Sequence, residues 1–486
     1  MSFNNQKILN SSTWLIGGNA YISFVGFIAS IFLMRKLDPL MFGVVASMAA
    51  INGLFEIFRD FGIGRCIIFS KDDELTATSN MSFIVNLAVG ILFSAVLFAG
   101  ANVIAQKMNI DQQYLNAIRL LSLNPLINSV VSTFDNHLQR RLLFRQKVIA
   151  EAISTTTYSV IATVLAFYGW GIWSLIVAQQ FAAVVLTAGY YINVKEYWKP
   201  EITLKGLNYS KVLHMGGHFT LSSIIVYLYN NLDNFTVAVL LGPQQLGYYS
   251  RGYNYAMMPS SFLGNVIAKI TGPMYNDLAE ARDKLAKAVK KIFTLLGIII
   301  PPLFMFVIIF AKYLVLLIVG PKWLPMILPF QILLVFSGLR LISSSAANVF
   351  PALGKNHLIS LVPLSYLILL VLLIYPGTKW LGITGTSIAV LLTVIVGGSI
   401  SIINAAKLLK ISTLIFIKPI IKAGLFCIIA WIVFKYIPGS ATATIPWLSF
   451  KIIIYLLLYT GFALLIMKNE IKEVVALKNI WVKYNG

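Results

Sequence analysis

Long apolar runs alternate with short polar segments along the whole chain. Runs of about 18 residues or more recur throughout, and each is long enough to cross a hydrocarbon core roughly 30 Å thick as an α-helix. The pattern therefore predicts an all-α polytopic membrane protein. Its fourteen expected spans are 12–34, 41–64, 81–105, 114–137, 148–168, 172–194, 213–241, 245–272, 292–311, 323–349, 357–376, 381–406, 416–437 and 447–467.

The composition supports this class. Hydrophobic residues make up 58% of the 486 positions and charged residues only 11%, which excludes an ordinary soluble protein. The start, MSFNNQKILNSS, is polar and precedes an apolar run of full spanning length, so no cleavable signal peptide is expected. Cys66 and Cys427 lie far apart, in or beside spans, so neither a disulfide nor a metal cluster is expected.

The basic residues indicate the orientation. The net charge of +21 is not framed by any motif for binding RNA or DNA, so no nucleic-acid partner is expected. With both termini in the cytoplasm, about 25 of the 38 Lys and Arg residues fall on that side, as the positive-inside rule requires. The inner segment 277–291 reads as a helix lying on the surface of anionic membrane lipids.

Two short motifs recur at nearly the same offset. LDPLMFG (37–43) and LGPQQLG (241–247) share L-x-P-x-x-[FL]-G, and GIWSLIVA (171–178) matches GITGTSIA (382–389). They predict that spans 1–6 and 7–12 are parallel copies, related by a pseudo-two-fold axis along the membrane normal. The expected domains are 1–211, 212–410 and 411–486, the last with two appended helices. Two such bundles around a midplane site are typical of an alternating-access transporter.

Asp233 and Arg251 are ionisable residues inside predicted spans, where such residues are costly and usually functional. Asp233 lies about 12 Å from the outer end of span 7, and Arg251 about 9 Å from the start of span 8, so the two can pair. One interpretation is a salt bridge that holds the bundle together. The other is a cavity wall on which Asp233 binds a proton or a cation and Arg251 binds an anion.

Other spans carry further candidates. Glu56, Arg59 and Asp60 share one face of span 2, either as a neutralised cluster or with Arg59 exposed to a cavity and Glu56 available for ion coupling. Arg340 has no acid nearby in sequence, which favours anion binding. Prolines within or near several spans predict kinks.

Polar and aromatic residues flank Asp233. Tyr248 belongs either to an outer aromatic belt or to a surface that stacks on sugars. Asn230 and Asn231 either hydrogen-bond sugar hydroxyls or bond to neighbouring helices. His214 and His218 lie one turn apart, but no third metal ligand is near them in sequence. The chain contains neither a Gly-rich phosphate loop nor G-x-S-x-G, so we expect a transporter without a cofactor, driven by H+, Na+ or the substrate gradient.

Three segments carry a family resemblance: STWLIGGNAYISFVGFIASIFLMRKLDPLMFGVVASM, FRDFGIGRCII and YNNLDNFTVAVLLGPQQLGYYSRGYNYAMMP. They resemble the polysaccharide transporter family, which comprises lipid-linked oligosaccharide flippases of the multidrug/oligosaccharidyl-lipid/polysaccharide exporter superfamily. The chain looks most similar to the colanic-acid and teichuronic-acid type. The most specific part is D-N-F-x4-L-L-G-x3-L-G-x-Y, from Asp233 to Tyr248.

The resemblance implies two six-helix bundles and two further helices. It implies that an oligosaccharide repeat unit on undecaprenyl pyrophosphate is moved from the inner to the outer leaflet of the bacterial cytoplasmic membrane, for exopolysaccharide or lipopolysaccharide synthesis, with contact to polysaccharide polymerase machinery. For site residues, the resemblance implies only Asp233 and its surroundings, whereas Arg59, Arg251 and Arg340 are inferred from their positions in the spans.

Two other functions compete with a flippase. An ion-coupled drug exporter of the same superfamily often uses an acid in span 1, and residues 12–34 contain none. A net positive intramembrane charge also suits an anionic substrate better than cationic drugs. A membrane polymerase or ligase would need a sizeable outer loop, which the sequence does not predict.

Overall fold

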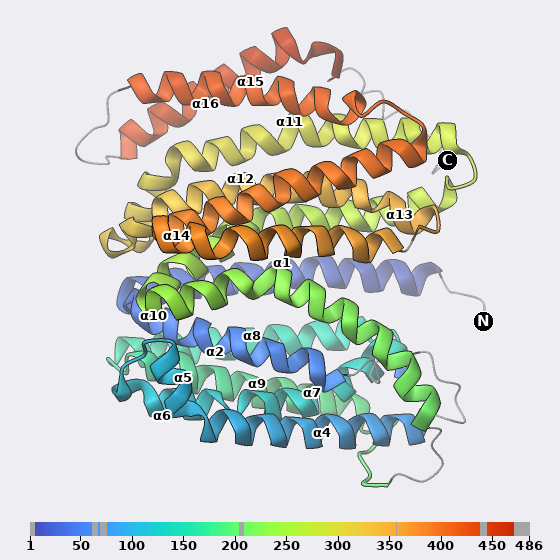
Figure 1. The fold of residues 1–486 in the computed structure, drawn as a ribbon, viewed down its shortest axis with the longest axis vertical. Coiled ribbons are helices and arrows are strands. Elements are labelled where there is room, and N and C mark those ends of the chain that lie inside the picture. The colour runs from blue at the N-terminus through green and yellow to red at the C-terminus, as the bar shows by residue number, and fades with distance from the viewer. Residues whose placement is uncertain are drawn as a thin grey trace. The chain divides into compact units, whose positions relative to one another are not determined.

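The computed structural model describes residues 5–60, 67–68, 75–203, 209–355, 357–437 and 445–470 (Figure 1). These residues form helices and the turns between them, and no strand occurs among them. The predicted all-α membrane architecture is therefore confirmed.

The chain divides into two compact units, Met1–Tyr248 and Tyr249–Gly486. In the first unit, α1 packs on α8, α8 on α9, and α7 on both α4 and α9. The predicted domain limits at residues 211 and 410 stay predictions. The helices of this unit are α1 (Asn5–Lys36), α2 (Pro39–Asp60), α4 (Leu75–Ala99), α5 (Ala101–Lys107), α6 (Leu115–Leu121), α7 (Asn124–Arg140), α8 (Phe144–Phe167), α9 (Ile172–Val194) and the first half of α10 (Tyr209–Asp277).

The second unit contains the rest of α10 and a set of long helices that run side by side in Figure 1. Here α12 packs on α14 and α11, and α15 packs on α11 and α16. The elements are α11 (Arg282–Leu314), the π-helical turn η2 (Val315–Val319), the 3-10 helix η3 (Pro321–Met326), α12 (Ile327–Ala347), α13 (Val349–Ala352), α14 (His357–Leu409), α15 (Leu414–Tyr436) and α16 (Ile445–Ile466).

Ten helical segments in the described ranges are long and apolar enough to cross a membrane. Two of them contain a kink, at Gly242 in α10 and at Gly382 in α14, so each joins two of the predicted spans. The span predicted at 41–64 overlaps a shorter apolar helix, Pro39–Leu54, and the one predicted at 114–137 is divided into α6 and α7. The total of fourteen spans stays a prediction.

The break between α6 and α7 has a local cause. Pro125 lacks the backbone N–H that would otherwise bond to the carbonyl of Leu121, four residues earlier. The side chain of Asn52 in α2 donates to that carbonyl instead, at 3.2 Å. Just beyond the break, the backbone N–H of Leu126 donates to the hydroxyl of Ser94 in α4, at 3.1 Å. Neighbouring helices therefore satisfy the backbone groups that the proline disrupts.

The second sequence repeat extends to the backbone geometry. Gly171 has φ 54° and ψ −131°, and its counterpart Gly382 has φ 61° and ψ −144°. Residues with a Cβ rarely adopt a positive φ, so both copies of the motif need glycine at this turn. The shared dihedral angles indicate that the two segments turn into their following helices in the same way.

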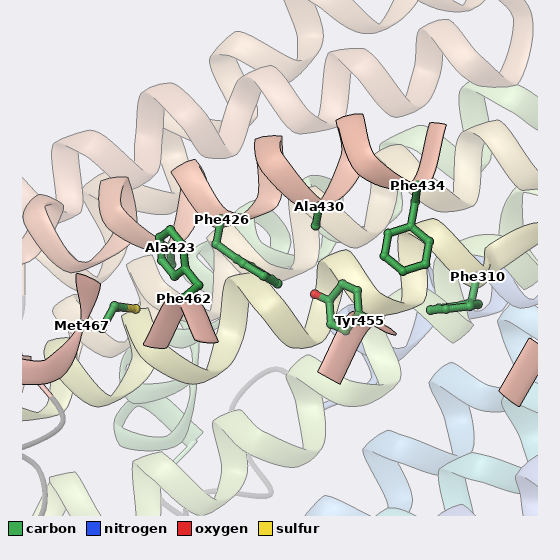
Figure 2. Close-up of a cluster of buried hydrophobic side chains, with 8 residues drawn as sticks. All are labelled: Phe310, Ala423, Phe426, Ala430, Phe434, Tyr455, Phe462 and Met467. Atoms are coloured by element: carbon green, nitrogen blue, oxygen red, sulfur yellow. The ribbon is translucent and has the colours of Figure 1, made fainter. Parts of the chain in front are cut away.

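The two C-terminal helices, α15 and α16, are fastened to α11 by a cluster of buried aromatic side chains (Figure 2). The ring of Phe310 lies 5.8 Å from that of Phe434, and the ring of Phe426 lies 5.5 Å from that of Tyr455. Aromatic pairs at such distances add to the stabilisation from area burial alone.

Hydrogen bonds reinforce this attachment. Pro302 removes the N–H that would bond to the carbonyl of Ile298, and the hydroxyl of Tyr459 in α16 donates to that carbonyl at 2.7 Å. The hydroxyl of Tyr455 donates to the carbonyl of Pro302 at 2.6 Å. The appended helix α16 therefore supports α11 at its proline pair.

Candidate functional site

The two copies of L-x-P-x-x-[FL]-G meet in space, within the unit Met1–Tyr248. A Cβ added to Gly43 would overlap the backbone carbonyl of Pro243, and a Cβ added to Gly247 would overlap the carbonyl of Pro39. The contact is reciprocal: each copy places its glycine against the proline of the other. Reciprocal contacts of this kind arise where a two-fold axis passes between equivalent surfaces. The two motifs therefore meet as equivalent surfaces, whereas the pseudo-two-fold relation between the two six-helix bundles stays a prediction.

The turn at the second copy is held by two features. Gly242 has φ 80° and ψ 177°, which glycine adopts at no steric cost. Pro243 cannot donate to the carbonyl of Val239, and the side chain of Asn109 donates to it instead, at 3.4 Å. A donor from another helix likewise serves the carbonyls freed by Pro125, at the break between α6 and α7, and by Pro302, inside α11.

Asp233 lies in the first half of α10 and is buried, with 2% of its surface exposed. Its Oδ1 accepts a hydrogen bond from the backbone N–H of Asn234 at 2.8 Å. The side-chain oxygen of Asn234 is also buried and accepts no hydrogen bond in the described structure. An acid and an unsatisfied amide oxygen on consecutive residues form a set of acceptors suited to a proton or a cation.

The two asparagines before Asp233 bond to their own helix. Asn230 donates to the carbonyl of Val226 at 2.8 Å, and Asn231 donates to that of Tyr227 at 3.1 Å. Both side chains are half-buried. Their predicted contacts with sugar hydroxyls stay predictions.

Arg340 lies in α12 and is half-buried. Its guanidinium donates to the hydroxyl of Tyr253 at 3.3 Å and lies 5.8 Å from the centre of the Phe336 ring. The rings of Tyr253 and Phe336 are 6.1 Å apart. The second unit therefore brings a permanent cation together with aromatic faces and a hydroxyl, groups that suit a phosphorylated sugar lipid.

The remaining candidates are placed only in part. Tyr248 is buried and Arg251 is half-buried. Because Asp233 and Arg251 belong to different units, their pairing stays a prediction. Residues 56, 59 and 60 fall in the last turn of α2, and residues 214 and 218 in the first turns of α10; these side chains and Cys66 lie outside the described residues.

The distribution of acidic residues along the chain is a signal that the motifs do not contain. From residue 284 to residue 469 the sequence contains no Asp or Glu, although basic residues recur throughout this stretch. It includes α12, with Arg340, and α16, with Lys451. Lys451 is buried, donates to the hydroxyl of Tyr313 at 3.2 Å and lies 5.3 Å from the Trp447 ring. Counting acids along the chain would have revealed this charge asymmetry.

A second polar network joins α7, α8 and α9. Lys147 lies 2.6 Å from a carboxylate oxygen of Asp135 and 3.9 Å from one of Glu151. Gln139 donates to Asp135 at 2.8 Å, and Tyr190 donates to Glu151 at 2.9 Å. Because these carboxylates are bound to side chains of the same three helices, the network stabilises their packing. Among the described residues, no group of three His, Cys, Asp or Glu side chains is placed to hold a metal ion.

Comparison with known proteins gives consistent results. A family described as "Polysaccharide biosynthesis protein" matches residues 32–328. Lipopolysaccharide biosynthesis protein WzxC of Escherichia coli (strain K12) is 24% identical over 432 residues, covering 86% of this chain and 82% of the relative. Teichuronic acid biosynthesis protein TuaB of Bacillus subtilis (strain 168) is 21% identical over 306 residues, covering 62% of each chain.

The fold is also similar to a solved structure. The lipid II flippase MurJ, in an inward closed conformation, superposes with a TM-score of 0.75 at 12% identity, covering 94% of this chain and 99% of that chain. At this identity the likeness concerns the fold alone.

Proposed function

Because the chain belongs to the polysaccharide biosynthesis protein family, we propose that it is a flippase for lipid-linked oligosaccharides. Its substrate is an oligosaccharide repeat unit on undecaprenyl pyrophosphate, which it moves from the inner to the outer leaflet of the bacterial cytoplasmic membrane. The names of its relatives, which concern lipopolysaccharide and teichuronic acid biosynthesis, support this assignment.

The observation that carries the proposal is a permanent cation, Arg340, in a long stretch of the second unit that has basic residues and no acidic ones. A pyrophosphate that crosses the membrane needs partners, because an isolated charge is very unstable in a low-dielectric medium. Arginine offers a permanent charge and two parallel hydrogen bonds to phosphate oxygens. Arg340 lies in a stretch, 284–469, whose sequence contains no Asp or Glu. We assign pyrophosphate binding to Arg340, with Arg59 and Arg251 as further candidates.

The sugars and the carrier need different surroundings. Tyr248, Asn230 and Asn231 are the candidates for contacts with the oligosaccharide, which requires a wet and polar path. The carrier lipid stays in apolar surroundings. Contact with polysaccharide polymerase machinery on the outer side belongs to the same proposal.

Transport requires the path to open to each side in turn. The reciprocal contact between Gly43 and Gly247 is the element that we assign to the closed outer side. Rocking of one repeat against the other separates the two motifs and opens the path outwards. Asp233, with the side-chain oxygen of Asn234 beside it, is the candidate that couples H+ or Na+ to this movement, and Glu56 is a second candidate.

The test measures lipid-linked oligosaccharide on the outer leaflet of cells that lack this protein and any redundant flippase. Wild-type chain restores the signal, whereas Arg340→Ala lowers it by at least roughly tenfold, the effect of losing about 1.4 kcal/mol of binding. Lys379→Ala is the matched control, because Lys379 is an exposed cation in α14 that lies 5.7 Å from the Tyr375 ring. Full activity of correctly inserted Arg340→Ala would refute the role of Arg340. Failure of the wild type to restore the signal would refute the flippase.

A further inference from the structure

A long hollow lies between α1 and α8 in the first unit. It consists of two adjoining cavities of about 390 Å³ and about 620 Å³, which share Tyr21, Ile149 and Ala152 in their walls. The first cavity reaches Trp14 and the second reaches Ile161. We call the two together the α1–α8 groove.

Two neighbouring glycines create the groove. A Cβ added to Gly18 would overlap the side chain of Val148, so this glycine allows α1 to approach α8 closely. A Cβ added to Gly17 would meet no atom within 4 Å. Gly17 therefore leaves an opening beside a tight helix contact.

The walls of the groove are suited to a hydrocarbon chain. Trp14, Tyr21 and Ile153 present large apolar surfaces that are 44%, 47% and 54% exposed. Where the wall carries hydroxyls, they are already hydrogen-bonded: Tyr21 bonds to Thr156 at 3.1 Å, and Thr157 donates to the carbonyl of Ile153 at 2.8 Å. Because these hydroxyls are satisfied, an apolar occupant would not leave them unpaired.

The length of the groove fits a membrane-embedded chain. Along α8 it runs from Val148 to Ile161, which corresponds to about 20 Å at 1.5 Å per residue. This is roughly two thirds of the thickness of the hydrocarbon core. An occupant of the groove therefore lies along the helices rather than across them.

A cation marks one end. The guanidinium of Arg145 lies 4.9 Å from the centre of the Trp14 ring, and Arg145 is one turn before Ile149 on α8. No acidic side chain is among the residues that line the groove. The groove thus combines an apolar channel with a positive charge at its mouth, on the side predicted to face the cytoplasm.

We propose that the α1–α8 groove holds the polyprenyl chain of the lipid-linked substrate, with the phosphate-bearing end of the lipid at Arg145. The assignment rests on the proposed function and adds a site to it. A phosphate on an apolar chain complements both the charge at the mouth and the channel behind it. A carrier chain held in the groove stays in apolar surroundings while its phosphate waits at the inner side, where the substrate enters.

The test uses photocrosslinking in lipid nanodiscs. The probe is polyprenyl pyrophosphate with a diazirine on its isoprenoid chain, and the crosslinked residues of the full chain are identified by mass spectrometry. Label is expected on residues 14–21 and 148–161. Gly17→Leu, which fills the opening without overlapping protein atoms at its Cβ, is expected to lower this label at least roughly tenfold. Gly26→Leu is the matched control on the same helix, since a Cβ there also meets no atom within 4 Å.

Several outcomes would overturn the assignment. Label that is spread over other helices, or that persists unchanged in a Gly17→Leu protein with wild-type melting temperature, shows that the groove does not hold the chain. In a second arm, photoactivatable phosphatidylglycerol is added to the wild-type protein with excess unlabelled polyprenyl pyrophosphate. If the phospholipid labels the groove and is not displaced, a membrane lipid occupies it instead.

The two proposals fail in different ways. Wild-type protein that moves lipid-linked oligosaccharide but shows no label in the groove refutes this inference alone. Protein that shows no such movement refutes the proposed function, whatever the label shows. Arg145→Met tests the mouth of the groove separately: it should weaken labelling by polyprenyl pyrophosphate more than labelling by the uncharged polyprenol probe, and equal effects would refute the role of Arg145.

Discussion

The reciprocal glycine contact between α2 and the residues of α10 just after its kink at Gly242 makes a sharp prediction about the transport cycle. In Gly43→Ala the new methyl group would overlap the carbonyl of Pro243, which is backbone and cannot rotate away. Overpacking of this kind costs about 1–3 kcal/mol. At about 1.4 kcal/mol per factor of ten, the population of the contacting state should fall by roughly 5- to 150-fold relative to the separated state.

Helix propensity does not complicate this prediction. Alanine stabilises a helix interior by about 1 kcal/mol over glycine, but residue 43 is helical in the contacting state and a rigid movement keeps it so. The gain therefore applies to both states and leaves their ratio unchanged. Gly26→Ala controls for it, because an added Cβ there meets no atom within 4 Å.

The assay is a spin-label distance measurement between positions 40 and 244, in a chain whose two cysteines are replaced by serine. Wild type and Gly26→Ala should give the same distribution, with the short distance of the contacting state. Gly43→Ala should move weight to longer distances, and Gly247→Ala should do the same because it overlaps the carbonyl of Pro39. If Gly43→Ala gives the distribution of Gly26→Ala, the contact does not control the state of the transporter.

Three further predictions concern stability. Tyr459→Phe removes the donor to the Ile298 carbonyl that Pro302 leaves without a helical partner, and should lower the free energy of unfolding by about 1–3 kcal/mol, measured by denaturation in detergent. Asn52→Ala removes the donor at the break between α6 and α7 and should also lower the free energy of unfolding by about 1–3 kcal/mol. An unchanged free energy of unfolding in either variant would show that water replaces the donor. Burial alone would raise the pKa of the Glu470 carboxyl, but the hydrogen bond from Lys422 at 2.6 Å holds that pKa below its ordinary value. The pair should therefore stabilise the protein above the unfolded pKa and lose that effect as the pH falls through the folded pKa, so Lys422→Met should flatten the acid side of a plot of melting temperature against pH.

Local properties of the sequence were enough to predict the long apolar helices, although the span predicted at 114–137 is divided into α6 and α7. A run of apolar residues specifies a membrane helix by its length alone, and a glycine that must take a positive φ marks a turn wherever the fold places it. The repeated motif predicted that Gly171 and Gly382 are equivalent positions, and the structure adds that both take a positive φ. Arg340, a permanent cation within an apolar run, was likewise recognised as a candidate binding residue from a local property.

Tertiary structure decided how these elements meet, because the partners are distant in sequence. Pro302 leaves the carbonyl of Ile298 without a helical donor, and nothing in the nearby sequence shows which group replaces it. The donor is Tyr459, in a helix that begins more than a hundred positions later. Motif spacing suggested that the L-x-P-x-x-[FL]-G segments were copies, but only packing showed that each glycine lies on the other copy's proline. The α1–α8 groove also depends on a contact between distant segments. Val148 occupies the space beside Gly18, whereas the space beside Gly17 is open, and this difference depends on which face of α1 meets α8.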